Sequence, residues 1–125
     1  MSGRYRELGF EGRSVVLRAL AYGNEAVVID TILGAAEGSD EPDWVEAAAL
    51  ALTRALDGQL QRAGLLALGM LVRRFPGRVD LLAVRSAAER LANDPDLAGT
   101  ALDLLDDIEV FSRDPRPPDV DESEA

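Results

Sequence analysis

The sequence contains no cysteine, no histidine and no lysine, and each absence removes a class of function. Without cysteine the chain forms no disulfides and offers no thiolate. Without histidine it lacks the commonest general base and metal ligand. Without lysine it cannot complete a Walker-type phosphate loop, and its serines have neither histidine nor lysine to activate them. We therefore expect a protein that is not an enzyme and binds no cofactor.

The composition does not exclude one kind of enzyme, a hydrolase with paired catalytic carboxylates, because Asp and Glu are abundant. It would also need a cleft in which two carboxylates converge, and a thin stack of helices is not expected to provide one.

Aromatic residues are scarce, at 5% of the chain against 47% for all hydrophobic residues, so Leu, Ala and Val must build the core. Such a core suits closely packed helices better than a β-sandwich. No apolar run is long enough to span a bilayer, and the N-terminus lacks the apolar segment of a secretory signal. We expect one domain, all-α, in the cytoplasm.

Basic residues are also few, with 13 against 23 acidic ones, which gives a net charge of −10. The phosphates of nucleic acid would be repelled by this charge. The acidity either only keeps the protein soluble or favours encounter with a basic protein. The expected partner is therefore a protein, with no nucleic acid and no membrane.

Apolar residues recur at helical spacing over six stretches separated by turn residues. The stretch from Asp57 to Phe75 is apolar around most of its circumference, so we expect it to be a central helix covered from more than one side. The predicted helices are 11–22, 25–37, 43–56, 59–75, 79–92 and 96–111.

A short motif repeats along the chain and groups the six predicted helices into three hairpins. It occurs as Leu33-Gly34, Leu68-Gly69 and Leu104-Leu105, with separations of 35 and 36 residues, which is a repeat-protein period. The sequence thus predicts three antiparallel helical hairpins stacked as a short right-handed solenoid over residues 1–111, with the second helices lining one surface. Residues 112–125 are acidic and proline-rich, and we expect a disordered tail there.

Two of the repeats carry residues of a known repeat family. The second reads Asp57…Arg62…Ala67-Leu68-Gly69, and the third reads Asp94-Pro95…Ala101…Leu104. In this the chain resembles HEAT repeats, whose second helix often opens Asp-Pro-x-x-x-Val-Arg and closes Ala-Leu-Gly. Gln61 stands where that pattern has Val, and Pro95 alone supplies the turn proline. The first hairpin barely matches, as expected of an end cap.

The segment from Ala63 to Phe111 is similar to a group of small bacterial HEAT-like proteins. It reads Leu68-Gly69-Met70-Leu71-Val72-Arg73, then Gly77 and Asp80, and finally Leu105-Asp106-Asp107-Ile108-Glu109-Val110-Phe111. The histidine that usually precedes the first of these runs is missing. Members of the group are often encoded near polymorphic toxins. This resemblance implies an immunity-type protein that neutralises a cognate toxin by covering its active surface; the alternative is a general HEAT-like scaffold or adaptor for a cytoplasmic protein.

An acidic run near the end of the last predicted helix is one candidate binding surface. Carboxylates in the second half of a helix oppose its dipole, so something should compensate them. Either they pair with Arg73, Arg74 or Arg85 on neighbouring helices, or they face a basic partner. A metal site is disfavoured, because carboxylates on one helix rarely converge without a second segment. The residues of this run are Asp103, Asp106, Asp107 and Glu109.

The second candidate surrounds the only tryptophan. Asp40, Glu41 and Asp43 precede Trp44 at the start of the third predicted helix. In one interpretation the indole covers the junction of the first two hairpins, and the acids favour the helix N-terminus. In the other, Trp44 is an aromatic anchor within an acidic rim, the composition of a binding hot spot.

Overall fold

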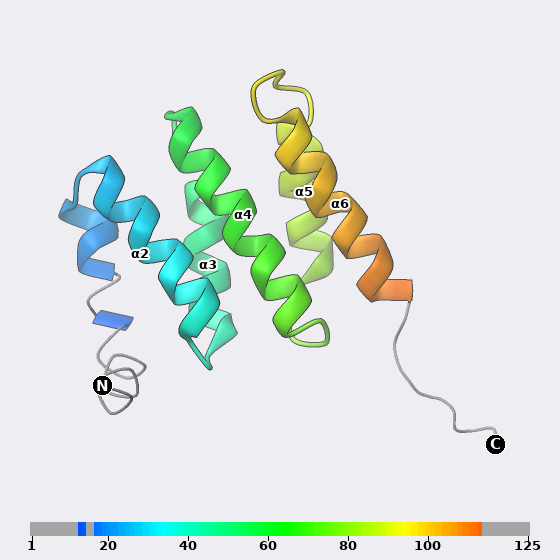
Figure 1. Ribbon diagram of the computed structural model, residues 1–125, viewed down its shortest axis with the longest axis horizontal. Helices are drawn as coiled ribbons and strands as arrows, with labels where there is room; N and C mark the ends of the chain where they lie inside the picture. The colour runs from blue at the N-terminus through cyan, green and yellow to red at the C-terminus, as the bar shows by residue number, and fades with distance from the viewer. Residues whose placement is uncertain (1–12, 15–16, 114–125) are drawn as a thin grey trace.

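The computed structural model describes residues 13–14 and 17–113, and the regular elements in this part of the chain are all helices, which confirms the all-α prediction (Figure 1). The expectations for residues 1–12 and for the tail from 114 to 125 lie outside the described residues. Helical residues at 17–22 precede five longer helices: α2 (Glu25–Gly38), α3 (Pro42–Leu52), α4 (Gly58–Arg74), α5 (Leu81–Leu91) and α6 (Ala98–Arg113).

The helices are stacked as antiparallel hairpins in two layers. Figure 1 shows α2, α4 and α6 running side by side in one direction, with α3 and α5 behind them. Helix α4 packs against α2, α3, α5 and α6, so it is the central helix that its sequence predicts. The second helices of the hairpins line one surface, also as predicted.

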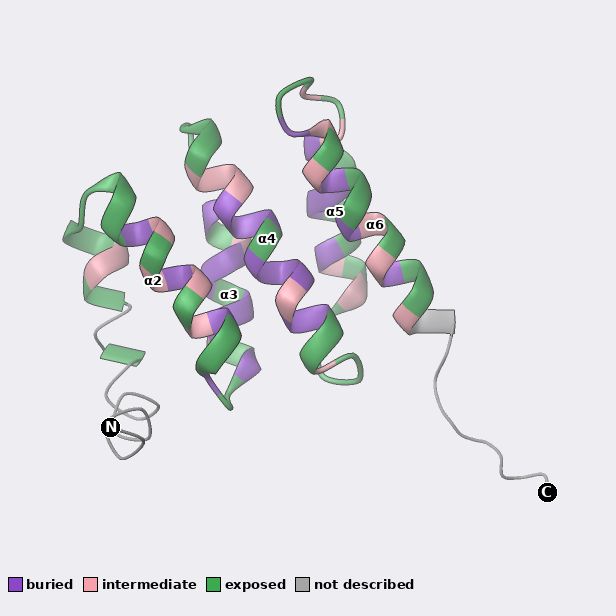
Figure 2. Ribbon diagram, viewed as in Figure 1, coloured by how far each residue is buried: buried purple, intermediate pink, exposed green. Residues whose placement is uncertain are grey.

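The core lies between the two layers and is made of aliphatic side chains. Leu68 and Leu71 of α4 are completely buried, together with Ile32 of α2 and Ile108 of α6. Figure 2 shows buried residues through the middle of α4 and exposed residues at its two ends. The apolar pattern of this stretch includes Leu66 in the face that we expect to be covered, and this prediction is wrong. The Leu66 side chain is 44% exposed, because none of the helices described here packs over the outer side of α4.

Side-chain caps fix where three of the helices begin. Asn24 accepts a hydrogen bond from the backbone N–H of Val27 at 2.9 Å, as its position predicts. Asp57 accepts from the N–H of Gln59 at 2.7 Å, and Asp80 caps α5 in the same way. Each cap satisfies backbone donors that the first turn of a helix leaves free.

Several helix boundaries differ from the predicted ones, most of all at the third helix and the last. The third helix ends at Leu52, four residues early, where the hydroxyl of Thr53 donates to the Leu50 carbonyl at 2.6 Å. Leu56, the last residue of the predicted helix, therefore lies fully exposed in the following loop.

The last helix begins later than predicted and also ends later. The sequence Asp94-Pro95 predicts an N-cap at Asp94, with the proline as first helical residue. In the structure the Asp94 carboxylate accepts from the N–H of Asp96 at 2.9 Å and closes a turn instead. The helix starts at Ala98 and continues to Arg113, two residues beyond the predicted end.

Candidate protein-binding surface

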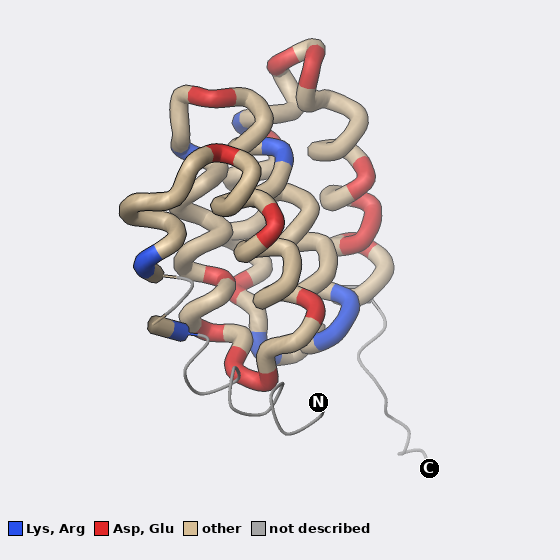
Figure 3. Tube along the Cα trace, turned by 60° about the vertical axis from the view of Figure 1, so that its left-hand side comes forward, with Lys and Arg blue, Asp and Glu red and all other residues tan. Residues whose placement is uncertain are grey.

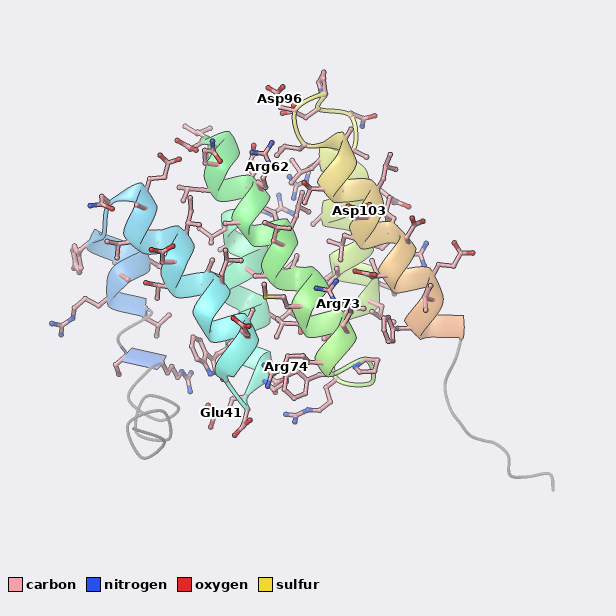
Figure 4. The ribbon with its side chains drawn as sticks, in the orientation of Figure 1. Glu41, Arg62, Arg73, Arg74, Asp96 and Asp103 are labelled. Carbon is pink, nitrogen blue, oxygen red and sulfur yellow. The ribbon has the colours of Figure 1, made fainter. Side chains whose placement is uncertain are left out.

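Polar bonds between neighbouring hairpins hold the helices of the candidate surface in register. Arg74, at the end of α4, donates to the carbonyls of Ala36 at 2.7 Å and Ser39 at 3.0 Å, where α2 ends. At the other end of α4, Arg62 donates to the Asp96 carbonyl at 2.7 Å (Figure 4). These bonds join residues 34 to 38 positions apart, which is the period of the sequence repeat.

The back layer is joined in the same manner. Arg90 of α5 donates to the carbonyl of Thr53 at 3.2 Å and to its hydroxyl at 3.3 Å. Glu46 of α3 accepts from the backbone N–H of Asp80 at 3.0 Å, at the start of α5. Both links again span about one repeat, 37 and 34 residues.

The acidic run of α6 takes part in an ion pair within the chain. Asp107 forms an ion pair with Arg73 of α4 at 2.6 Å, and the two side chains are 27% and 50% exposed. This is the internal pairing that the sequence allowed, with the first of the three arginines considered. Arg74 is occupied by carbonyls instead, and among the described residues no ion pair reaches Arg85.

The other acidic residues of the run are exposed on α6. Figure 3 shows acidic positions following one another along this helix, which leads to the C-terminus. Asp103 lies one turn before Asp107 and is labelled in Figure 4. Asp106 and Glu109 lie further around the helix.

The tryptophan of the second candidate is half-buried and packs against the core. Its indole Nε1 is buried and has no hydrogen-bond acceptor among the described residues. Asp40, Glu41 and Asp43 are exposed, and the N–H of Glu41 donates to the hydroxyl of Ser39 at 3.0 Å. Most of the Trp44 ring therefore serves packing, as the first interpretation expects, and the acids around it face solvent.

The two candidates do not form one site. The acids around Trp44 lie where α2 ends and α3 begins, whereas the acidic run lies on α6, and α4 separates the two (Figure 1).

Glu46 is a feature that the sequence did not reveal. It is buried, and this burial is the main reason why the pKa of Glu46 is raised. The nearby charges of Asp80 and Asp43 raise the pKa of Glu46 as well, while the hydrogen bond from the Asp80 N–H lowers it. A lone Glu in an alanine-rich stretch carries no signal of such a role.

No group of three potential metal ligands comes together within the described residues. None of the helices described here is long and apolar enough to cross a membrane.

No protein-family model matches the chain, and no curated protein matches it. A solved structure matches the chain: the crystal structure of a CDI complex from Cupriavidus taiwanensis LMG 19424. One chain of that structure is 25% identical to this chain and superposes on it with a TM-score of 0.71. The match covers 78% of this chain and 88% of that one. The chain shares its fold with a component of a CDI complex. The resemblance to HEAT repeats finds no support in this comparison and stays a prediction.

Proposed function

We propose that the protein is an immunity-type binding module, which neutralises a cognate toxin by covering its active surface. The observation that carries this proposal is the fold shared with a chain of a CDI complex, over most of the length of both chains. CDI denotes contact-dependent inhibition, in which a toxin is matched by an immunity protein. The similarity of residues 63–111 to proteins encoded near toxins points the same way.

Inhibition by coverage needs a rigid surface and no chemistry of its own. The inter-hairpin bonds and the buried core supply the rigidity. The absence of histidine, cysteine and lysine from the chain fits a role without catalysis. A general adaptor would use the same kind of surface, but the shared fold favours the toxin as partner.

A basic toxin is the partner that the charge of the chain favours. Opposite charges speed association, whereas dissociation depends more on anchors that lose their water. Asp103 and Asp106 of α6 and the exposed acids around Trp44 suit the first role, and the exposed part of the half-buried Trp44 suits the second. Surface charges are screened within a Debye length of about 8 Å at physiological salt. We therefore expect the association rate to fall as salt is added.

Co-expression in a bacterium tests the function. The probe is the toxic domain encoded directly upstream of this chain, produced with the chain or without it. We expect growth only when the chain is present, and a 1:1 complex on size-exclusion chromatography. Growth arrest despite normal levels of folded chain, or no toxin gene beside this one, would overturn the proposal.

A further inference from the structure

Charge and exposed apolar groups are distributed differently over the two layers. Helix α2 carries three acidic residues and no basic one, and α6 carries four acidic residues. Helix α4, between them, has no acidic residue at all. In the back layer, α5 has Glu89 against Arg85 and Arg90, and α3 has Asp43 and the buried Glu46. Most of the acidic residues on the helices therefore lie in two rows that flank α4.

The helical spacing identifies which residues of these rows face outward. Positions three, four and seven apart share one side of a helix. Gly34 of α2 and Gly99 of α6 confirm the direction, since an added Cβ at either would meet nothing within 4 Å. The outward residues, called the outer strip below, are Val27, Asp30, Gly34 and Glu37 of α2, Leu66 and Met70 of α4, and Gly99, Asp103, Asp106 and Val110 of α6.

The centre of the outer strip is apolar. Between Arg62 and Arg73 the outer side of α4 presents only Leu66, which is 44% exposed, and Met70, which is half-buried. Both arginines are held by internal acceptors at the two ends of the helix, the Asp96 carbonyl and Asp107.

The apolar exposure continues on the flanking helices. Val27 and Val110 are 43% and 53% exposed, whereas Leu82 is the only large apolar side chain exposed on α3 or α5. An exposed apolar patch with a polar rim is typical of an interaction site.

We infer that the outer strip is where the toxin docks, with an apolar centre of the toxin on Leu66 and Met70. Lysine or arginine on one side of that centre pairs with Asp30 and Glu37. Basic residues on the other side pair with Asp103 and Asp106. This inference rests on the proposed function and assigns it a surface.

The geometry of the layer fits one element of a basic partner. Packed helices lie about 8–10 Å apart, so the acidic rows of α2 and α6 stand on either side of α4 with room for a single helix or loop between them. Among the described residues, no ion pair engages these four carboxylates. They can therefore pair with a partner without breaking a salt bridge of the chain.

Cysteine labelling tests the location directly, because the chain contains no cysteine of its own. Leu66→Cys places a thiol in the outer strip. The control is Leu82→Cys, which places a thiol at an exposed position of α5 in the back layer. The probe for both is the toxic domain from the co-expression test. We expect complex formation to slow maleimide labelling of Leu66→Cys at least tenfold and to leave Leu82→Cys unchanged. Unchanged labelling of Leu66→Cys within a stable complex would overturn the inference.

Charge reversal tests the flanking rows. The paired variant Asp30→Arg, Asp103→Arg should weaken toxin binding at least tenfold, mainly through slower association, and Glu89→Arg on α5 is the matched control. Circular dichroism establishes that each variant is folded. If the paired variant binds with wild-type affinity, the toxin does not dock on the outer strip, and the proposed function is not contradicted. If the wild-type chain forms no complex, the proposed function itself fails, and the assigned surface fails with it.

Discussion

Gly64 shows how closely two helices approach in this core. A Cβ at this position would lie 2.7 Å from the Ala49 carbonyl oxygen and about 3 Å from side-chain atoms of Leu52 and Thr53. The backbone oxygen cannot move without displacing α3. Glycine is disfavoured in helices by about 0.5–1 kcal/mol relative to alanine, so this close contact accounts for its presence here.

We expect Gly64→Ala to lower the free energy of unfolding by about 1–3 kcal/mol, because the added methyl overpacks the contact between α3 and α4. Urea denaturation measures the change. Gly34→Ala is the control, since nothing lies within 4 Å of its Cβ. It should raise stability by about 0.5–1 kcal/mol. Equal effects at the two glycines would contradict the packing account.

Glu46 predicts a pH dependence of stability. Its pKa is raised above the ordinary value of 4.5, so the folded chain holds this proton to higher pH than the unfolded chain. The contribution of Glu46 to stability is therefore greatest at low pH, and it falls as pH rises from 4.5 through the raised pKa.

Glu46→Gln should remove this pH-dependent contribution to stability, because the amide oxygen can still accept a hydrogen bond from the Asp80 N–H but carries no charge. Thermal unfolding of both proteins across this pH range measures the difference. We expect the variant to gain stability relative to wild type as pH rises to neutrality. The exposed control Glu89→Gln should show no such trend, and a constant difference for Glu46→Gln would refute the assignment.

At the scale of the helices, the two consecutive arginines at the end of α4 have unequal roles. Arg74 donates hydrogen bonds to two carbonyls where α2 ends, and its guanidinium carbon Cζ lies 4.6 Å from the centre of the Phe75 ring. Arg73 makes a partly exposed ion pair with Asp107. We expect Arg74→Ala to cost about 1–2 kcal/mol of stability. Arg73→Ala should cost less than about 1 kcal/mol. Chemical denaturation of the two variants compares them, and the reverse order would show that the carbonyl bonds do not join α2 to α4.

Most of the helices could be predicted, because their signals are local. The apolar spacing gave α4 its central place, and Asn24 marked the start of α2 through its own side chain. The end of α3 could not be predicted in this way. Leu56 continues the apolar pattern, but the Thr53 hydroxyl bonds the Leu50 carbonyl and the chain turns away before reaching it. Such competition between a side chain and the helix backbone leaves no periodic signal.

At the scale of the whole molecule, two leucines of α4 should respond in opposite ways to the same substitution. Leu68 is completely buried between the layers, and Leu66 is 44% exposed. Leu68→Asp buries an unpaired charge and should unfold the domain. Leu66→Asp should leave it folded, as monitored by circular dichroism. A helical, soluble Leu68→Asp variant would mean that the core is elsewhere.

The candidate surface was only partly visible in the sequence. The acids of α6 lie close together in the sequence and are easy to find. Asp30 and Glu37 are seven residues apart in α2, and only the stacking of α2 beside α4 shows that they lie opposite the α6 row. The internal pairing of Asp107 with Arg73 was one of two open alternatives, because the choice depends on which arginine the next hairpin brings within reach.

The spacing of the inter-hairpin bonds has a consequence for how such a chain can change in length. The bonds that cross between hairpins among the described residues span 34 to 38 residues, so each connects one repeat to the next. An in-frame duplication of α3 and α4 would repeat the bonds of Arg74 and Glu46, because these side chains bond backbone atoms of the neighbouring hairpin. The ion pair of Arg73 would not form between the two copies of α4, because α4 has no carboxylate. The duplication would add one parallel helix to the front layer and widen the proposed docking surface by one row. Proteins of this kind can thus evolve a larger binding surface by duplication of a hairpin, while the contacts inside that hairpin stay the same.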